Sequence, residues 1–375
     1  MKTNQLILAA ALVALAACSK ENVVSNVNLD SNEIGFNAVS RLATKANNAI
    51  ITGTAYATDN TFQVWGWQSE AADFSEFSDD AASNFMTDLT IEWTKGRDNT
   101  RAEAWRNASN YYYWPFTGKI SFLAIHPSSV APSSTGWDAT NDKPKATFAD
   151  YTISSANKTV DLMLANNDGS RRSDALPMVF NHALAQIQFR ARTNEDYSND
   201  VTFTLKSVKL NNIDLSGDLA YANSAFAWTD NNTQTEEWAY YTADQVVTYA
   251  ATDANAALYG DANVMIPQPA YVHVDAVGAP GDPGYVAEVE GTTITIGYTM
   301  KQTGSAPITG TVTVPAPWTK VKEGSTDYNP AEAISAWEPG KKYNYTLNFK
   351  LNEILFDPTV TNWVEVEMST INIID

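Results

Sequence analysis

The chain has 375 residues, of which 44% are hydrophobic and 18% are charged, and its length suggests two domains of ordinary size. With 11 Trp, 17 Tyr and 14 Phe it can bury a large apolar core, which argues against global disorder. The formal net charge of −19 argues against nucleic acid and anionic lipid headgroups as partners, because both are bound by clustered Lys and Arg.

The N-terminus has the pattern of an export signal. An apolar run at 6–17 is shorter than the roughly 20 residues that span a bilayer and has the length of a signal-peptide core. Cys18 is the chain's only cysteine, and Leu15–Cys18 resembles a bacterial lipobox. We therefore expect cleavage between Ala17 and Cys18 and a diacylglycerol lipid on the Cys18 thiol. The alternative is an ordinary secretory signal with an incidental cysteine.

After the leader, a polar stretch precedes a series of strand-like segments. Residues 19–32 are rich in Asn and Ser, as expected of a tether. Further segments are β-branched and aromatic, and most alternate apolar with polar residues, which predicts strands. These segments are 35–40, 61–67, 119–125, 185–191, 201–210, 292–300, 309–314 and 343–351. Helical spacing is scarce, and 71–89 is its best example. The pattern predicts a mainly β protein built of antiparallel sandwiches.

The domain organisation expected from these segments has four parts. They are a signal peptide at 1–17, a lipidated tether at 18–32, an N-terminal β-sandwich at 33–175 and a C-terminal β-sandwich at 176–375. The boundary is placed at the polar run NNDGSRRSDALP, which we interpret as a solvated linker.

Catalytic and metal-binding patterns give no positive sign of an enzyme. The sequence has no HExxH, no GxSxG and no phosphate-binding glycine loop, so we predict no enzyme, no cofactor and no metal site. His126, His182 and His273 are far apart; we expect His126 in a turn before Pro127 and His182 packed at a strand edge. A glycosidase pair of carboxylates stays open, because sequence spacing does not fix separation in space.

Two aromatic clusters could serve as sugar-stacking platforms. These are WGW at 65–67 and YYYWPF at 111–116. Trp and Tyr that alternate in a β protein more often form the core and cross-strand pairs, so we favour a structural role.

The two ends of the folded region carry a further pattern. Residues 33–39 predict a first strand, and the polar stretch after it contains Arg41 and Lys45, where a trypsin-like protease could cut. The plain alternative is an exposed loop with two cations. At the C-terminus, 364–374 alternates in a way that suits an edge strand or a strand added to a foreign sheet. Its apolar positions are Val364, Val366 and Met368, followed after a change of phase by Ile371 and Ile373.

Taken in order, these pieces resemble the fimbrillin family of Bacteroidales, the type V pilus subunits and their Mfa-like lipoprotein relatives. The matching segments are the lipobox leader, 35–46, 85–127, 161–191 and 340–368. The most specific are the strand–His-Ala-Leu-Ala–strand at mid-chain and Val-Thr-Asn-Trp near the end. The resemblance implies two tandem transthyretin-like β-sandwich domains with few short helices.

The resemblance also implies a function in adhesion as a structural subunit of a fimbrium. Such a subunit reaches the outer membrane surface as a lipoprotein, and a trypsin-like protease then removes its first strand. The best match for the cut is between Arg41 and Leu42, with Lys45 and Ala46 as second choice. A donor strand of the next subunit, here 364–374, then fills the gap. The implied partners are other pilus subunits, the outer membrane through Cys18, the protease, and a host glycan or protein.

Three other functions stay open at this point. The chain could be a non-polymerising anchor that keeps its lipid, a tip adhesin, or a surface lipoprotein that binds glycans for uptake. The aromatic content motivates the last of these.

Overall fold

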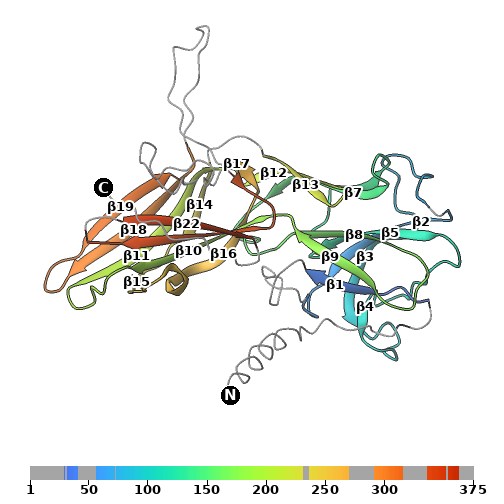
Figure 1. Ribbon diagram of the computed structural model, residues 1–375, viewed down its shortest axis with the longest axis horizontal. Helices are drawn as coiled ribbons and strands as arrows, with labels where there is room; N and C mark the ends of the chain where they lie inside the picture. Colours follow the sequence, from blue (N-terminus) through green and yellow to red (C-terminus); the bar gives the residue numbers. More distant parts are fainter. Residues whose placement is uncertain are drawn as a thin grey trace, which may run out of the picture.

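The structure is a computed structural model, and it is built almost entirely of strands (Figure 1). It describes residues 29, 32–40, 56–71, 73–230, 236–269, 291–315 and 336–351, and the backbone of 354–362. Within these residues the one helical element is the single 3-10 turn η1 (Asp253–Asn255). The prediction of a mainly β protein is confirmed.

The strands of the N-terminal part form a closed barrel (Figure 1, right). Its order is β1 (Phe36–Ser40), β4 (Ala104–Arg106), β3 (Met86–Thr94), β2 (Phe62–Ser69), β5 (Lys119–His126), β8 (Met163–Gly169) and β9 (Leu176–His182). β1 closes the circuit, because it pairs with β4 on one side and with β9 on the other. The pairing with β9 is parallel, unlike the other pairings of this barrel.

Strand β2 is buried on both faces, and its alternating side chains enter two different cores. Phe62 and Val64 point into the barrel, in the same hydrophobic cluster as residues of β1. Trp65 and Trp67 belong to a larger cluster on the other face. There the Trp67 ring lies 6.0 Å from the Trp137 ring of a second sheet. This sheet has the order β13 (Ala225–Asp230), β12 (Ser216–Ala222), β7 (Lys143–Thr152) and β6 (Ser134–Asp138).

The C-terminal part is a sandwich of two sheets (Figure 1, left). One sheet has the order β16 (Ala257–Met265), β10 (Ala185–Thr193), β21 (Lys341–Phe349) and β22 (Ile354–Asn362), with β10 parallel to β21. The other has the order β14 (Glu236–Tyr241), β11 (Val201–Ile213), β18 (Thr293–Gln302) and β19 (Ile308–Pro315), and β15 (Gln245–Val247) also pairs with β11. Two short strands, β17 (Gln268–Pro269) and β20 (Ala336–Trp337), pair with each other. Apolar side chains from both sheets meet between them, as where the rings of Phe203 and Phe349 lie 5.6 Å apart.

All eight predicted strands are present, but two local predictions are wrong. The described part of 71–89 is not helical: it forms turns until β3 begins at Met86. Phe74 and Phe77 fold this segment down by packing their rings 5.1 Å from that of Trp137. The polar run at 166–177 is not simply a linker, because residues 166–169 complete β8 and 176–177 begin β9.

The domain boundary predicted between residues 175 and 176 stays a prediction. Strand pairing crosses it at two places. β9, which follows it, pairs with β8 and β1 of the barrel, and the β12–β13 hairpin pairs with β7. In the described part of the chain, no helix has the length and apolarity needed to cross a membrane.

Candidate functional site

The strand β1 is a fully integrated part of the barrel core. Ile34, two residues before β1, and Phe36 and Ala38 within it are all buried, whereas a loosely attached leader would leave such side chains exposed. The Phe36 ring makes edge-to-face contacts with Phe62 and Phe122, at centroid distances of 6.0 and 5.3 Å. Such pairs add to the stabilisation that area burial gives, so β1 contributes substantially to the stability of the barrel.

Backbone hydrogen bonds hold this segment on both sides. Along β9 the register runs from Phe36 opposite Leu176 to Ser40 opposite Phe180. On the other side the amide of Ile34 donates to the carbonyl of Tyr112, and the amide of Trp114 donates to the carbonyl of Asn32, each at 2.8 Å. We call the position of residues 32–40, between β9 on one side and β4 with 112–114 on the other, the β1 slot.

A buried charge cluster lies at the start of the β1 slot. Glu33 is only 1% exposed, and its carboxylate forms ion pairs with Arg101 and Arg106. The Glu33 Oε1 to Arg106 Nη1 distance is 3.3 Å, and the Arg106 side chain is 2% exposed. Burying these charges costs free energy that their mutual attraction must offset. Glu33 therefore ties the leading segment to two arginines that lie about seventy residues later in the chain.

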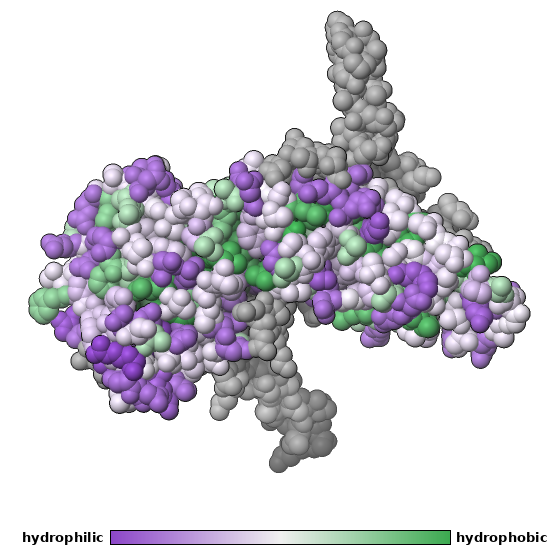
Figure 2. Space-filling view, turned by 180° about the vertical axis from the view of Figure 1, so that it is seen from behind, coloured by the Kyte–Doolittle hydropathy of each residue, from purple (hydrophilic) through white to green (hydrophobic). Residues whose placement is uncertain are grey.

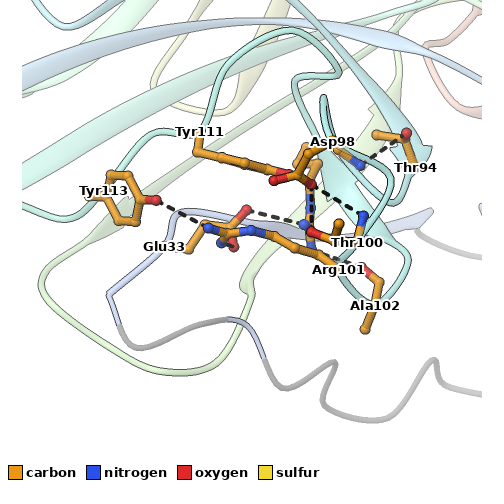
Figure 3. A network of polar contacts seen from close by, with 10 residues as sticks. Glu33, Thr94, Asp98, Thr100, Arg101, Ala102, Tyr111 and Tyr113 are labelled. Carbon is orange, nitrogen blue, oxygen red and sulfur yellow. Dashed lines mark hydrogen bonds and ion pairs between the residues drawn. The ribbon is translucent and has the colours of Figure 1, made fainter.

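Polar neighbours hold Arg101 in place, as Figure 3 shows. Its guanidinium lies over the ring of Tyr111, 3.8 Å from the centroid, and donates a hydrogen bond to Tyr113 Oη at 3.3 Å. Tyr111 Oη in turn donates to Asp98 Oδ1 at 2.5 Å. This hydrogen bond, with that from Thr100, lowers the pKa of Asp98 to about 2. A charged Asp98 thus fixes Tyr111, and Tyr111 supports Arg101.

A third arginine reaches the same segment from the other side of the slot. Arg171 Nε donates to Asn32 Oδ1 at 2.5 Å, and its guanidinium lies over the Phe116 ring, 5.1 Å from the centroid. Phe116 is 85% exposed, so this contact lies at the surface. The leading segment therefore meets three arginines in a protein whose net charge is −19.

A second buried polar cluster lies in the same barrel, next to β1. His126 is not the turn residue that we expected: it ends β5 and is fully buried. Its Nδ1 lies 2.6 Å from Tyr56 Oη and 3.1 Å from the carbonyl oxygen of Thr61. Burial lowers the pKa of His126 to about 4, although Asp161 nearby acts in the opposite direction. The imidazole is therefore neutral in the folded protein at ordinary pH.

This burial predicts a pH-dependent stability. Because the pKa of His126 is lower in the folded than in the unfolded chain, its contribution is complete above about pH 6.5 and is lost as the pH falls towards 4. Over that window the wild type should lose about 3 kcal/mol through this group. Denaturant unfolding of the wild type and of His126→Gln from pH 7 to pH 4.5 checks this. Equal pH slopes for the two proteins would contradict it.

The other residues singled out from the sequence are dispersed. His182 ends β9 and is packed and bonded, as predicted, with Nδ1 2.8 Å from Asp161 Oδ2. Among the residues described, no three His, Cys, Asp or Glu are grouped so as to hold a metal ion. Trp65 and Trp114 of the aromatic clusters are buried at 5% exposure each, so neither offers a face for sugar stacking. The coloured face in Figure 2 likewise shows small, separated hydrophobic patches.

Several predicted site residues lie outside the described residues. They are Ala17, Cys18, Arg41, Leu42, Lys45, Ala46, His273, Val364, Val366, Met368, Ile371 and Ile373. Sequence reasoning in turn missed Glu33, Arg101 and Arg106. An acid next to a predicted buried strand was the available signal, but its partners are too distant in sequence to be paired without the fold.

The site and fold define a class of protein: a strand-built chain in two parts whose first strand closes a barrel and is held there by a buried ion pair. The family model for fimbrillin-like proteins matches residues 44–363, and the chain belongs to the fimbrillin-like family. No curated protein shows a significant match to the sequence.

Solved structures provide a likeness in fold. A fimbrial protein from Bacteroides vulgatus superposes with a TM-score of 0.55 at 17% identity, covering 89% of this chain and all (100%) of its own. A candidate cell adhesion protein from Bacteroides uniformis has a TM-score of 0.46 at 13% identity, covering 88% of this chain and 99% of its own. The first likeness, at 17% identity, supports the fold alone.

Proposed function

We propose that this protein is a structural subunit of a cell-surface pilus that is activated by loss of its first strand and polymerises by donor-strand exchange. Membership of the fimbrillin-like family supports a function as a pilus subunit. The observation that carries the mechanism is the position of β1, which closes the barrel and buries Ile34, Phe36 and Ala38 in its core. A strand placed in this way completes the fold while it is present and opens it when it leaves.

Removal of β1 would create the two things that an assembling subunit needs. The first is a pair of open strand edges, on β9 and β4, whose amides and carbonyls then lack partners. The second is a row of empty pockets where Ile34, Phe36 and Ala38 had packed. A strand from another copy can satisfy both, and a head-to-tail contact of this type repeats without closing, so it builds a filament.

The sequence supplies the remaining parts of the proposal. Cys18 carries the lipid that holds the precursor on the outer membrane, and a trypsin-like protease cuts after Arg41, the residue that follows β1 directly, or after Lys45. The donor is 364–374, which begins two residues after β22 ends at Asn362. Within the described strands β22 lies at the edge of its sheet.

Processing and assembly are tested together on full-length precursor. Limited trypsin treatment should give a new N-terminus at Leu42 and convert monomers into filaments visible by electron microscopy. The double variant Arg41→Ala, Lys45→Ala should stay uncut there and monomeric, and deletion of 364–375 should allow the cut but abolish filaments. Filaments formed by uncut protein would contradict the proposal. Cut protein that never assembles would contradict it too, and would favour a non-polymerising anchor.

A glycan-binding function has less support. The two tryptophans that would carry it, Trp65 and Trp114, are core residues in this structure. Adhesion to a host glycan or protein is proposed as a property of the assembled fimbrium.

A further inference from the structure

The charges at the β1 slot are divided unequally when the first strand leaves. Glu33 lies upstream of Arg41 and departs with β1, whereas Arg101 and Arg106 belong to the barrel and stay. Arg106 is the critical one, because its side chain is 2% exposed while a strand fills the slot. Besides Glu33, the contact described for it is a hydrogen bond from Nη2 to the carbonyl oxygen of Ala102 at 3.0 Å.

A buried guanidinium that loses its carboxylate is costly, by an amount that exceeds what a backbone carbonyl returns. A replacement strand that fills only the apolar pockets would leave that cost in the polymer. A strand that also brings an acid to the position of Glu33 would restore the ion pair. A donor strand that fits the slot therefore needs a carboxylate immediately before its first inward apolar residue, as Glu33 precedes Ile34.

We propose that the β1 slot selects its occupant by charge, and that Glu365 of a second copy takes the position of Glu33 and so sets the register of the donor strand. This inference rests on the proposed function and defines the partner: an acidic strand of the same chain. In this register Val366, Met368 and Thr370 replace Ile34, Phe36 and Ala38. The largest pocket receives the long Met side chain, and the smallest receives Thr.

Neighbouring registers fit less well. Shifting the donor by two residues so that Val364 replaces Ile34 puts Trp363 against the arginines and Met368 in the small Ala38 pocket. Shifting it the other way puts Glu367 at the arginines but places Thr370 in the Phe36 pocket. One-residue shifts turn the apolar face outward, because strand side chains alternate.

The slot also has room for the second donor acid. Glu367 would align with Gly35, where an added Cβ would meet the Leu29 side chain at 2.8 Å. Leu29 lies upstream of the cut and leaves with β1. This position is therefore less crowded in the processed subunit, and Glu367 can occupy it. The antiparallel pairing of Phe36 with Trp105 places it opposite Arg106, whereas the Glu33 position meets both Arg101 and Arg106.

Charge selection is tested with two matched substitutions in full-length protein cut by trypsin. Glu365→Gln should slow filament growth or weaken subunit addition about tenfold or more, because it removes the carboxylate from the position at which Glu33 meets both Arg101 and Arg106. Glu367→Gln removes the same charge two residues along the same strand and should cost less than about threefold, because Glu365 still meets both arginines at the Glu33 position. Equal effects of the two substitutions would overturn the inference. Failure of the unsubstituted cut protein to form filaments would instead overturn the proposed function and the inference with it.

Register is tested by cysteine pairs, for which this chain is well suited because its single cysteine, Cys18, is lost on processing. Val179, which is 40% exposed, lies opposite Val39 in the parallel pairing of β9 with β1. With Val179→Cys in place, the register proposed here puts residue 371 beside it, whereas shifts of two residues put 369 or 373 there. Oxidation, or a short bismaleimide, should give a ladder of linked subunits with Ile371→Cys. A stronger ladder with Ser369→Cys or Ile373→Cys, or none of the three in assembled filaments, would overturn the inference.

Discussion

Replacing Phe36 with alanine is expected to lower the free energy of unfolding of the uncut precursor by about 3–5 kcal/mol. The ring is 2% exposed and packs edge-to-face on Phe62 and Phe122, so its loss leaves a cavity in the barrel core. Guanidinium titration followed by tryptophan fluorescence measures the change, since Trp105 and Trp114 report on this core.

The control and the decisive comparison use the same measurement. Val39→Ala, at a half-buried position of the same strand, should cost about 1 kcal/mol or less. Once the chain is cut after Arg41 and the leading fragment removed, Phe36→Ala should have no effect, because the residue is no longer present. A Phe36→Ala precursor as stable as the wild type would show that β1 is dispensable to the core, and the assembly proposal would lose its basis.

Removing the carboxylate of Glu33 is expected to destabilise the precursor by a similar amount, about 3–5 kcal/mol for Glu33→Ala. The cause differs from that of Phe36→Ala, because what remains is a buried positive charge on Arg106 rather than a cavity. The double variant Glu33→Ala, Arg106→Met should recover most of the loss, since an apolar side chain of similar length needs no partner. A double variant as unstable as the single one would mean that the ion pair is not the source of the effect.

The β content and the strand positions were readable from the sequence because alternation of side chains is a local property. Segment 185–191 alternates apolar and polar residues and forms β10. The largely apolar run at 119–125 forms β5. Two of the strands that were missed, β4 and β8, are respectively short and polar at one end. Residues 166–169 contain turn-forming Asn, Asp and Gly, yet pairing with β5 extends them into β8.

The helix expected within 71–89 failed for a related reason. Apolar residues at irregular spacing suggested a helical face, but Phe74 and Phe77 are placed by the ring of Trp137, which lies sixty residues further on. His126 was likewise expected in a turn because Pro127 follows it. Its burial depends on Tyr56 and on the closure of the barrel around it. These contacts are long-range, so the residues next to His126 in sequence do not predict them.

The sequence by itself determined that this chain is a β protein with an export leader pattern, a basic stretch after the first strand and an alternating C-terminal segment, because each of these is written in consecutive residues. Only the tertiary structure decided that β1 closes a barrel, that it runs parallel to β9, and that Glu33 meets Arg101 and Arg106. These contacts join residues up to about 140 positions apart. Their existence depends on how far-separated strands pair, and the energy of a buried charge depends on what that pairing places beside it.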